Sequence, residues 1–212
     1  MNLFFWKKRQ QDKKEVPAFI ADLERYVKEF VAAGFLSEDE IVEAAIECVS
    51  GEAEPETMRS HAVLLTKQAL ADHFAGQAKW SSPTDCDRLD AAFAELEESG
   101  IVSRQNFSCC QNCGSYEIGD EMRKRFDEGL PVRGYTFYHQ QDTESAVEGF
   151  GLCFAYGSTE EPVESSIAIG NEICNVLRKH GLKPEWDGSI KKRISLPIDW
   201  KRRRAHQNRV PH

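Results

Sequence analysis

The chain lacks the glycine-rich and nucleophile motifs by which many enzymes can be identified from sequence. Its 212 residues contain no G-x-G-x-x-G, no P-loop and no G-x-S-x-G. Nucleotide binding and serine-hydrolase chemistry therefore have no support in the sequence. No apolar run is long enough to span a bilayer, and no hydrophobic segment with a cleavage site opens the chain, so we expect neither membrane insertion nor secretion.

Internal repeats and long low-complexity linkers are also missing, and 41% apolar residues are enough to build a hydrophobic core. The seven cysteines are odd in number and unevenly spaced. This pattern favours reduced thiols in the cytoplasm over a disulfide framework.

Charge is distributed unevenly along the chain. Residues 1–14 carry five Lys or Arg against one acid, and residues 191–212 carry eight against one. The remaining 15–190 hold 14 basic and 33 acidic residues, a net charge of −19. An acidic body favours a basic protein partner and would repel nucleic acid, so we expect the Lys201–Arg204 run to be a solvated tail.

The first hundred residues have the periodicity of helices. Apolar residues recur at helical spacing from Phe19 to Val31 and stop at Gly34, while Ser37 and Glu40 form a capping-box pattern. Two further helices are expected, one with Pro55 in its first turn and one from Thr84 to Gly100. We therefore predict a helical domain over 15–100.

After Gly100 the pattern changes to short strands and helices. A helix is expected over 115–128, and Ser158 with Glu161 resembles a capping box for another that ends at Gly181. The expected strands are 101–104, 134–140, 150–156, 183–187 and 193–198. The prediction is an α+β protein whose 101–200 domain is an antiparallel ββαββ sheet with helices on one face, followed by the basic segment 201–212.

Three cysteines lie within five residues of one another. Cys110 and Cys113 have the C-x2-C spacing that lets a turn point two sulfurs at one tetrahedral ion, and Cys109 adds a third thiol. No second C-x2-C and no H-x3-H pair follows. Half of a zinc site is therefore visible, and the other ligands must come from distant positions.

His139 and Cys153 are the candidates for these ligands. If the two central strands pair with Phe137 opposite Cys153, then His139 and Cys153 share one face of the sheet. Cys110, Cys113, His139 and either Cys109 or Cys153 would then form a closed zinc site that ties the helical half to the sheet.

Two other interpretations use the same residues. In the first, the cysteines are small buried apolar residues and His139 is a hydrogen-bonded strand residue. In the second, Cys113 is a nucleophile activated at a helix N-terminus, with His139 as base and Asp142 or Glu144 as its orienting acid. A candidate functional loop holds Gln140, Gln141, Asp142 and Glu144.

Four segments resemble a family of bacterial proteins of unknown function. They are Arg104–Gly114, Tyr138–Glu144, Ala155–Gly157 and Glu185–Gly188, and the resemblance covers roughly residues 85–204. It implies a bacterial cytoplasmic protein in which the cysteine-rich segment and the His-Gln-Gln-Asp segment belong to one structural unit. It implies no reaction and no catalytic residues.

Together these observations predict a cytoplasmic protein that binds another macromolecule. One version is an acidic immunity-type protein that neutralises a basic toxin domain, with a structural zinc site. The alternative is a cysteine- or metal-dependent enzyme that acts on a small molecule in a pocket between the two parts. Nothing in the sequence indicates an oligomeric state.

Overall fold

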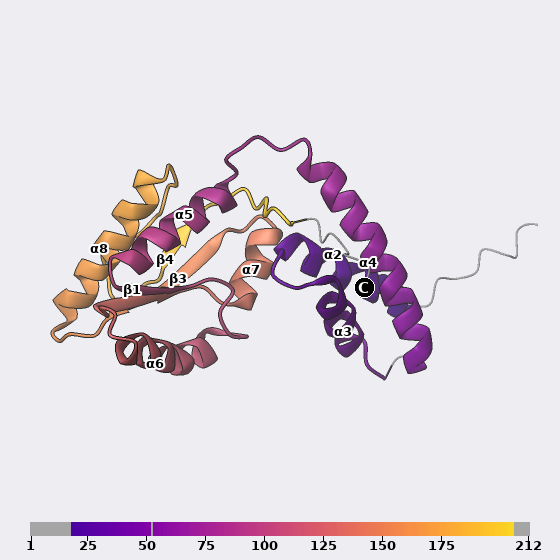
Figure 1. Cartoon of the computed structure of the whole chain (residues 1–212), viewed down its shortest axis with the longest axis horizontal. Helices are drawn as coiled ribbons and strands as arrows, with labels where there is room; N and C mark the ends of the chain where they lie inside the picture. The colour runs from indigo at the N-terminus through magenta and orange to yellow at the C-terminus, as the bar shows by residue number, and fades with distance from the viewer. Residues whose placement is uncertain (1–17, 52, 206–212) are drawn as a thin grey trace, which may run out of the picture. The chain divides into compact units, whose positions relative to one another are not determined.

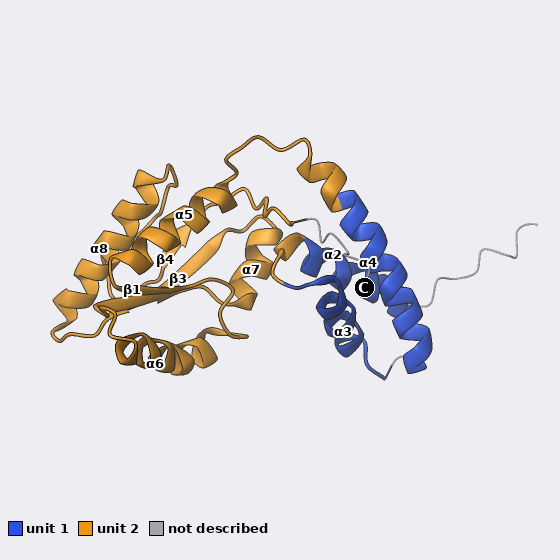
Figure 2. Ribbon diagram, viewed as in Figure 1, with its two compact units in different colours: residues 1–31, 36–72 blue, residues 32–35, 73–212 orange. Residues whose placement is uncertain are grey.

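The computed structural model describes residues 18–51 and 53–205, which form two compact units (Figures 1 and 2). The first contains the described residues up to Val31 together with Leu36–Asp72. The second contains Ala32–Phe35 and the described residues from His73 onward. The basic segment predicted at 1–14 and the tail beyond residue 205 lie outside the described residues.

The first unit is built from three helices, α2 (Ala18–Ala33), α3 (Glu38–Cys48) and α4 (Pro55–Gln77), of which the last continues into the second unit. On α2 the buried residues are four apart and form one stripe: Phe19, Leu23, Val27 and Val31. The predicted capping box at Ser37 and Glu40 is present, and Gly34 has the left-handed φ of 84° expected just after a helix.

The second unit contains a four-stranded sheet of order β1-β2-β3-β4. The strands are β1 (Ile101–Arg104), β2 (Gly134–Phe137), β3 (Leu152–Ser158) and β4 (Ile194–Leu196). β1 and β2 are parallel, and the other two pairs are antiparallel. The predicted all-antiparallel sheet is therefore wrong, because α6 (Gln111–Asp127) is a crossover that lets β2 run parallel to β1.

Helices cover both faces of this sheet. Figure 1 shows α5 (Asp85–Glu98) and α8 (Val163–Lys179) on one side and α6 on the other. Ile101 packs with the core under α5 and α8, whereas its neighbour Val102 packs with Ile118 of α6. The expectation of helices on one face was wrong because successive strand residues are apolar and bury both faces.

The connections also differ from the prediction. The strand expected to reach residue 140 ends at Phe137, which pairs with Ala155, and the helix α7 (Gln140–Val147) follows. Pro162, rather than Ser158, precedes the first turn of α8. The strand expected over 183–187 is reduced to one bridge between Glu185 and Ser195.

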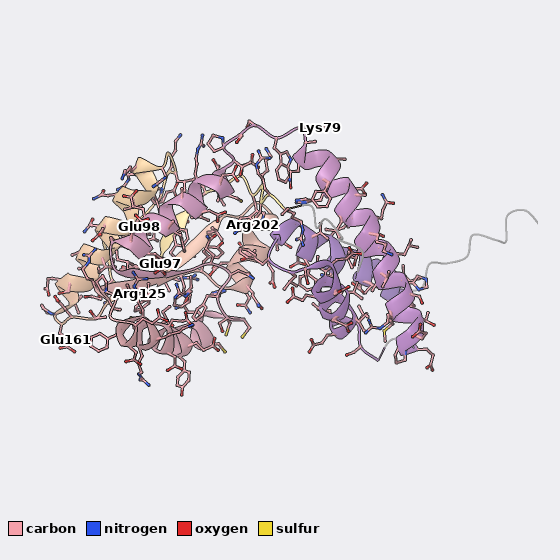
Figure 3. The ribbon with its side chains drawn as sticks, in the orientation of Figure 1. Lys79, Glu97, Glu98, Arg125, Glu161 and Arg202 are labelled. Carbon is pink, nitrogen blue, oxygen red and sulfur yellow. The ribbon has the colours of Figure 1, made fainter. Side chains whose placement is uncertain are left out.

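The C-terminal arginines pack against α5 instead of forming a solvated tail. Arg202 pairs with Asp90 at 3.0 Å and its guanidinium lies 4.2 Å from the centre of the Phe35 ring. Arg203 pairs with Asp87 at 3.1 Å. Figure 3 labels Arg202 in this segment. Because α5 packs on the sheet and binds these arginines, it belongs to the second unit, and the units divide near residue 72 rather than at residue 100.

None of the helices within the described residues is both long enough and apolar enough to cross a membrane.

Candidate metal centre

The cysteine turn, which we define as residues 105–113, connects the carboxyl end of β1 to the first turn of α6. Asn106 and Ser108 adopt left-handed backbone conformations with φ of 51° and 62°. The Phe107 N–H donates to the carbonyl of Tyr138 at 2.8 Å, and the Gln140 N–H donates to the carbonyl of Ser108 at 3.1 Å. The cysteine turn and the start of α7 thus form one structural unit beside the carboxyl ends of two parallel strands, where open α/β sheets bind ligands.

Three sulfur atoms gather at this turn. The Sγ atoms of Cys109, Cys110 and Cys113 all lie within 4.8 Å of one another. Cys109 is exposed and the other two are partly buried. Cys110 is the N-cap residue of α6, with extended φ and ψ of −156° and 172°, and its carbonyl accepts the first helical hydrogen bond from Gly114 at 2.9 Å. The first turn of the helix therefore brings Cys113 beside the two preceding thiols.

Two contacts fix the orientation of α6 against the sheet. At Gly114 a Cβ atom would lie 2.5 Å from the Phe137 ring, so the helix approaches β2 more closely there than any other residue would allow. Near its other end Arg125 pairs with Glu97 of α5, and both are labelled in Figure 3. Glu97 also pairs with Arg104, the last residue of β1.

The thiols of the turn differ in acidity. The pKa of Cys110 is lowered, first because the Cys113 N–H lies close to its sulfur and then because the two neighbouring thiols donate to it. The interactions with Cys109 and Cys110 raise the pKa of the Cys113 thiol to about 11. The expectation that Cys113 is the activated thiol was wrong because α6 begins at Gln111, which places Cys110 at the helix N-terminus.

The geometry fits a thiophilic metal ion. Four sulfurs at 2.3 Å from a tetrahedral zinc ion are about 3.8 Å apart, so the three thiols need to close by no more than roughly 1 Å. Within the described residues no other set of three His, Cys, Asp or Glu residues brings its ligand atoms this close together. The three cysteines could therefore hold a metal ion, with His139 and Cys153 outside the set.

His139 belongs to a separate polar cluster, the histidine cap, which we define as His139, Asp142 and Arg193. His139 is the N-cap residue of α7: its Nδ1 accepts from the Asp142 N–H at 3.3 Å, and the Asp142 carboxylate accepts from the His139 N–H at 3.0 Å. Arg193 donates to the same carboxylate and to the carbonyl of Cys153. Burial lowers the pKa of His139, which favours a neutral ring with its Nδ1 already occupied.

The predicted functional loop divides between two roles. Asp142 is buried and serves the histidine cap, whereas Gln140, Gln141 and Glu144 are exposed on α7. Arg193 was not predicted to be the partner of Asp142. The two residues are 51 positions apart, and no local pattern relates them.

Two hollows among the described residues lie in the second unit. A hollow of about 560 Å³ lies between α5 and α8, and another of about 490 Å³ lies beside the end of α4. Neither is lined by the cysteine turn or the histidine cap. The predicted base and acid are in contact, because His139 Nε2 lies 3.1 Å from the Asp142 carboxylate, and both residues are buried.

Comparison with known proteins adds a family but no activity. A family model described as "Domain of unknown function (DUF6891)" matches residues 16–204. The match includes the helical first unit, which the resemblance noted in the sequence did not cover. No curated protein and no solved structure matches the chain.

Proposed function

The chain belongs to this family of unknown function, and from the geometry of the cysteine turn we propose that it binds one zinc ion through Cys109, Cys110 and Cys113. The observation that carries the proposal is the convergence of three sulfurs within 4.8 Å on a turn that is hydrogen-bonded to Tyr138 and to Gln140, the first residue of α7. Thiolates are preferred ligands of zinc, and the amino end of α6 favours the negative charge that three thiolates bring.

The fourth coordination position is open in this proposal. Structural zinc sites are closed by four protein ligands, whereas sites with three protein ligands leave one position for water or a substrate. Within the described residues the cysteine turn has only three such groups, and Cys109 is exposed to solvent. The ion would act as a Lewis acid on whatever group occupies that position.

The exposed start of α7 is joined to the cysteine turn. The Gln140 N–H is hydrogen-bonded to Ser108 in the cysteine turn, and the side chains of Gln140 and Gln141 are both exposed. Amide side chains donate and accept hydrogen bonds without carrying charge. They are therefore suited to orient a small polar ligand or a polar side chain of a partner beside the ion.

Zinc content and affinity test the proposal. We expect about one equivalent of zinc in the purified protein by elemental analysis. Competition with a chromogenic chelator should show that the affinity for zinc is reduced by more than about 100-fold in each serine variant of Cys109, Cys110 and Cys113. This reduction is larger than the usual effect of removing a residue that only hydrogen-bonds to a metal ligand.

The matched controls are Cys153→Ser and His139→Asn, which should keep full affinity because neither residue belongs to the group of three. Far less than one equivalent of zinc in protein never exposed to chelator would overturn the proposal. A loss of affinity in the controls equal to that in the turn variants would instead restore the closed site predicted from sequence.

A second candidate function, binding of a basic protein partner, is supported by the acidic residues around α3. Between residues 34 and 58 the sequence has eight acidic residues and neither lysine nor arginine. Among them, Asp39, Glu43 and Glu47 are exposed on α3. Such a surface would attract a basic protein and speed its association at low salt.

Affinity capture at low and high salt, with the wild-type chain and an Asp39→Lys, Glu43→Lys, Glu47→Lys variant, tests this candidate. A basic protein retained by the wild-type chain at low salt and lost in the variant is the expected result. Recovery of no basic partner at low salt would contradict it.

A further inference from the structure

We propose that Cys110 and Cys113 form a reversible disulfide by exchange with a low-molecular-weight disulfide, and that this oxidation releases the metal ion from the cysteine turn. The disulfide itself does not need the ion. The control of metal binding rests on the zinc binding proposed above.

The pairing follows from the backbone of the turn. Adjacent residues are 3.8 Å apart at Cα, below the 4.4–6.8 Å that disulfides span, so Cys109 and Cys110 do not pair with each other. Cys110 and Cys113 occupy the N-cap and third positions of α6. Residues three apart in the first turn of a helix are neighbours, and their sulfurs already lie within 4.8 Å. Any disulfide in the turn must therefore include Cys113. Of its two possible partners, Cys109 and Cys110, Cys110 is the nearer in the sequence and belongs to the first turn of the helix.

The turn is also accessible and held in place. Cys110 and Cys113 are partly exposed, whereas Cys86 and Cys174 are buried in the core. The hydrogen bonds from Phe107 and Gln140 hold the turn without any covalent link between sulfurs. A small disulfide can therefore reach the pair, and closing the bond needs only a local movement of two side chains.

The exchange balances in two steps. The Cys110 thiolate attacks one sulfur of the small disulfide, forming a mixed disulfide and expelling one small thiolate. Cys113, after losing its proton to water, attacks the Cys110 sulfur and expels the second small thiolate. The protein loses two electrons and two protons, and the small disulfide gains them as two thiols. Only Cys109 then remains as a thiolate ligand, which is too few to hold zinc.

The test equilibrates metal-free, full-length protein in buffers with increasing ratios of oxidised to reduced glutathione. Acid quenching, alkylation and mass spectrometry then identify the disulfides. We expect a two-electron oxidation that links Cys110 to Cys113 in the wild type and in Cys109→Ser, and that is absent in Cys110→Ser and Cys113→Ser. Cys48→Ser is the control for an exposed thiol elsewhere. Circular dichroism of each variant verifies folding.

Zinc binding is then measured on the oxidised protein and again after reduction. Loss of binding on oxidation and its return on reduction support the control of metal binding, and unchanged affinity of the oxidised form contradicts it. If fully oxidised glutathione gives no 110–113 disulfide, or only mixed disulfides, the inference is overturned even where zinc binds. If the disulfide forms but the reduced protein binds no zinc, the redox pair stands and the proposed zinc function fails.

Discussion

The cysteine turn and the histidine cap lie beside each other at the carboxyl ends of β1 and β2, yet they differ in how far their polar atoms are satisfied. In the histidine cap, Asp142 accepts from the His139 N–H and from Arg193, and both His139 and Asp142 are buried. In the cysteine turn three sulfurs lie within 4.8 Å of one another, Cys109 is exposed, and no fourth potential ligand among the described residues belongs to the group. Residue types that suggest chemistry occur in both, but only the thiols have coordination capacity left for a ligand.

This difference assigns separate roles to the two clusters. The histidine cap should contribute to stability and leave zinc binding unchanged, whereas the cysteine turn should bind zinc and contribute little to the stability of the metal-free protein. Each of the following changes tests one side of that division.

The largest effect is expected for Asp142→Ala. The change removes the acceptor for the His139 N–H and leaves Arg193 without its carboxylate, while the Arg193 side chain is 31% exposed and regains some hydration. We expect a loss of about 3 kcal/mol in the free energy of unfolding, measured with urea. The control is Glu144→Ala, an exposed carboxylate on the same helix. Equal losses of unfolding free energy in both variants would show that the histidine cap contributes no more to stability than an exposed carboxylate does.

Gly114→Ala should have the next largest effect. A Cβ atom there would lie 2.5 Å from the buried Phe137 ring, so α6 or the ring must shift, at a cost of about 1–3 kcal/mol. Gly119 lies in the same helix, and a Cβ atom there would meet nothing within 4 Å. Gly119→Ala should therefore stabilise the protein by about 0.5–1 kcal/mol. Urea unfolding of the two variants measures the change in the free energy of unfolding that each substitution causes. Two changes of the same sign would contradict the close approach of α6 to β2.

The pH dependence of stability sharpens the assignment of His139. Burial lowers the pKa of His139 in the folded state, so the unfolded chain binds the proton more readily. The stability from the neutral ring is fully present above the unfolded pKa of about 6.5 and is lost as the pH falls below it. His139→Asn keeps an N-cap acceptor without a titrating ring.

Melting temperatures at pH 7.5 and pH 5.5 give the comparison. We expect the wild-type protein to lose more stability than His139→Asn over this interval. Burial also lowers the pKa of His73, but that residue is unchanged in both proteins and its contribution cancels. Identical pH profiles would show that His139 is not the titrating group.

The smallest effect is expected in the metal-free cysteine turn. Cys110 is partly exposed and serine is close to it in size, so Cys110→Ser should change the free energy of unfolding by less than about 0.5 kcal/mol when chelator is present. With zinc added, only the wild-type protein should gain stability. A large loss in the metal-free variant would mean that the thiols form part of the core.

Local signals in the sequence were the reliable ones. The capping box at Ser37, the glycine that follows α2 and the strand at 101–104 were correctly predicted, because each depends on residues within one turn or strand. The C-x2-C spacing likewise identified the thiols that the structure brings together.

Relations between distant residues were not accessible in the same way. The parallel pairing of β1 with β2 and the contact of Arg193 with Asp142 depend on the packing of segments that carry no matching local pattern. The prediction of a solvated Lys201–Arg204 run was wrong for the same reason, since the acidic partners of Arg202 and Arg203 lie on α5, more than a hundred positions earlier.

X-ray absorption spectroscopy at the zinc edge on the wild-type protein tests the central claim most directly, because it counts the ligand atoms around the ion. The account predicts three sulfurs at about 2.3 Å and one oxygen or nitrogen at about 2.0 Å, with the sulfur count falling to two in Cys109→Ser. Four sulfurs, or two sulfurs with imidazole scattering from His139 in the wild type, would contradict the open three-thiolate site.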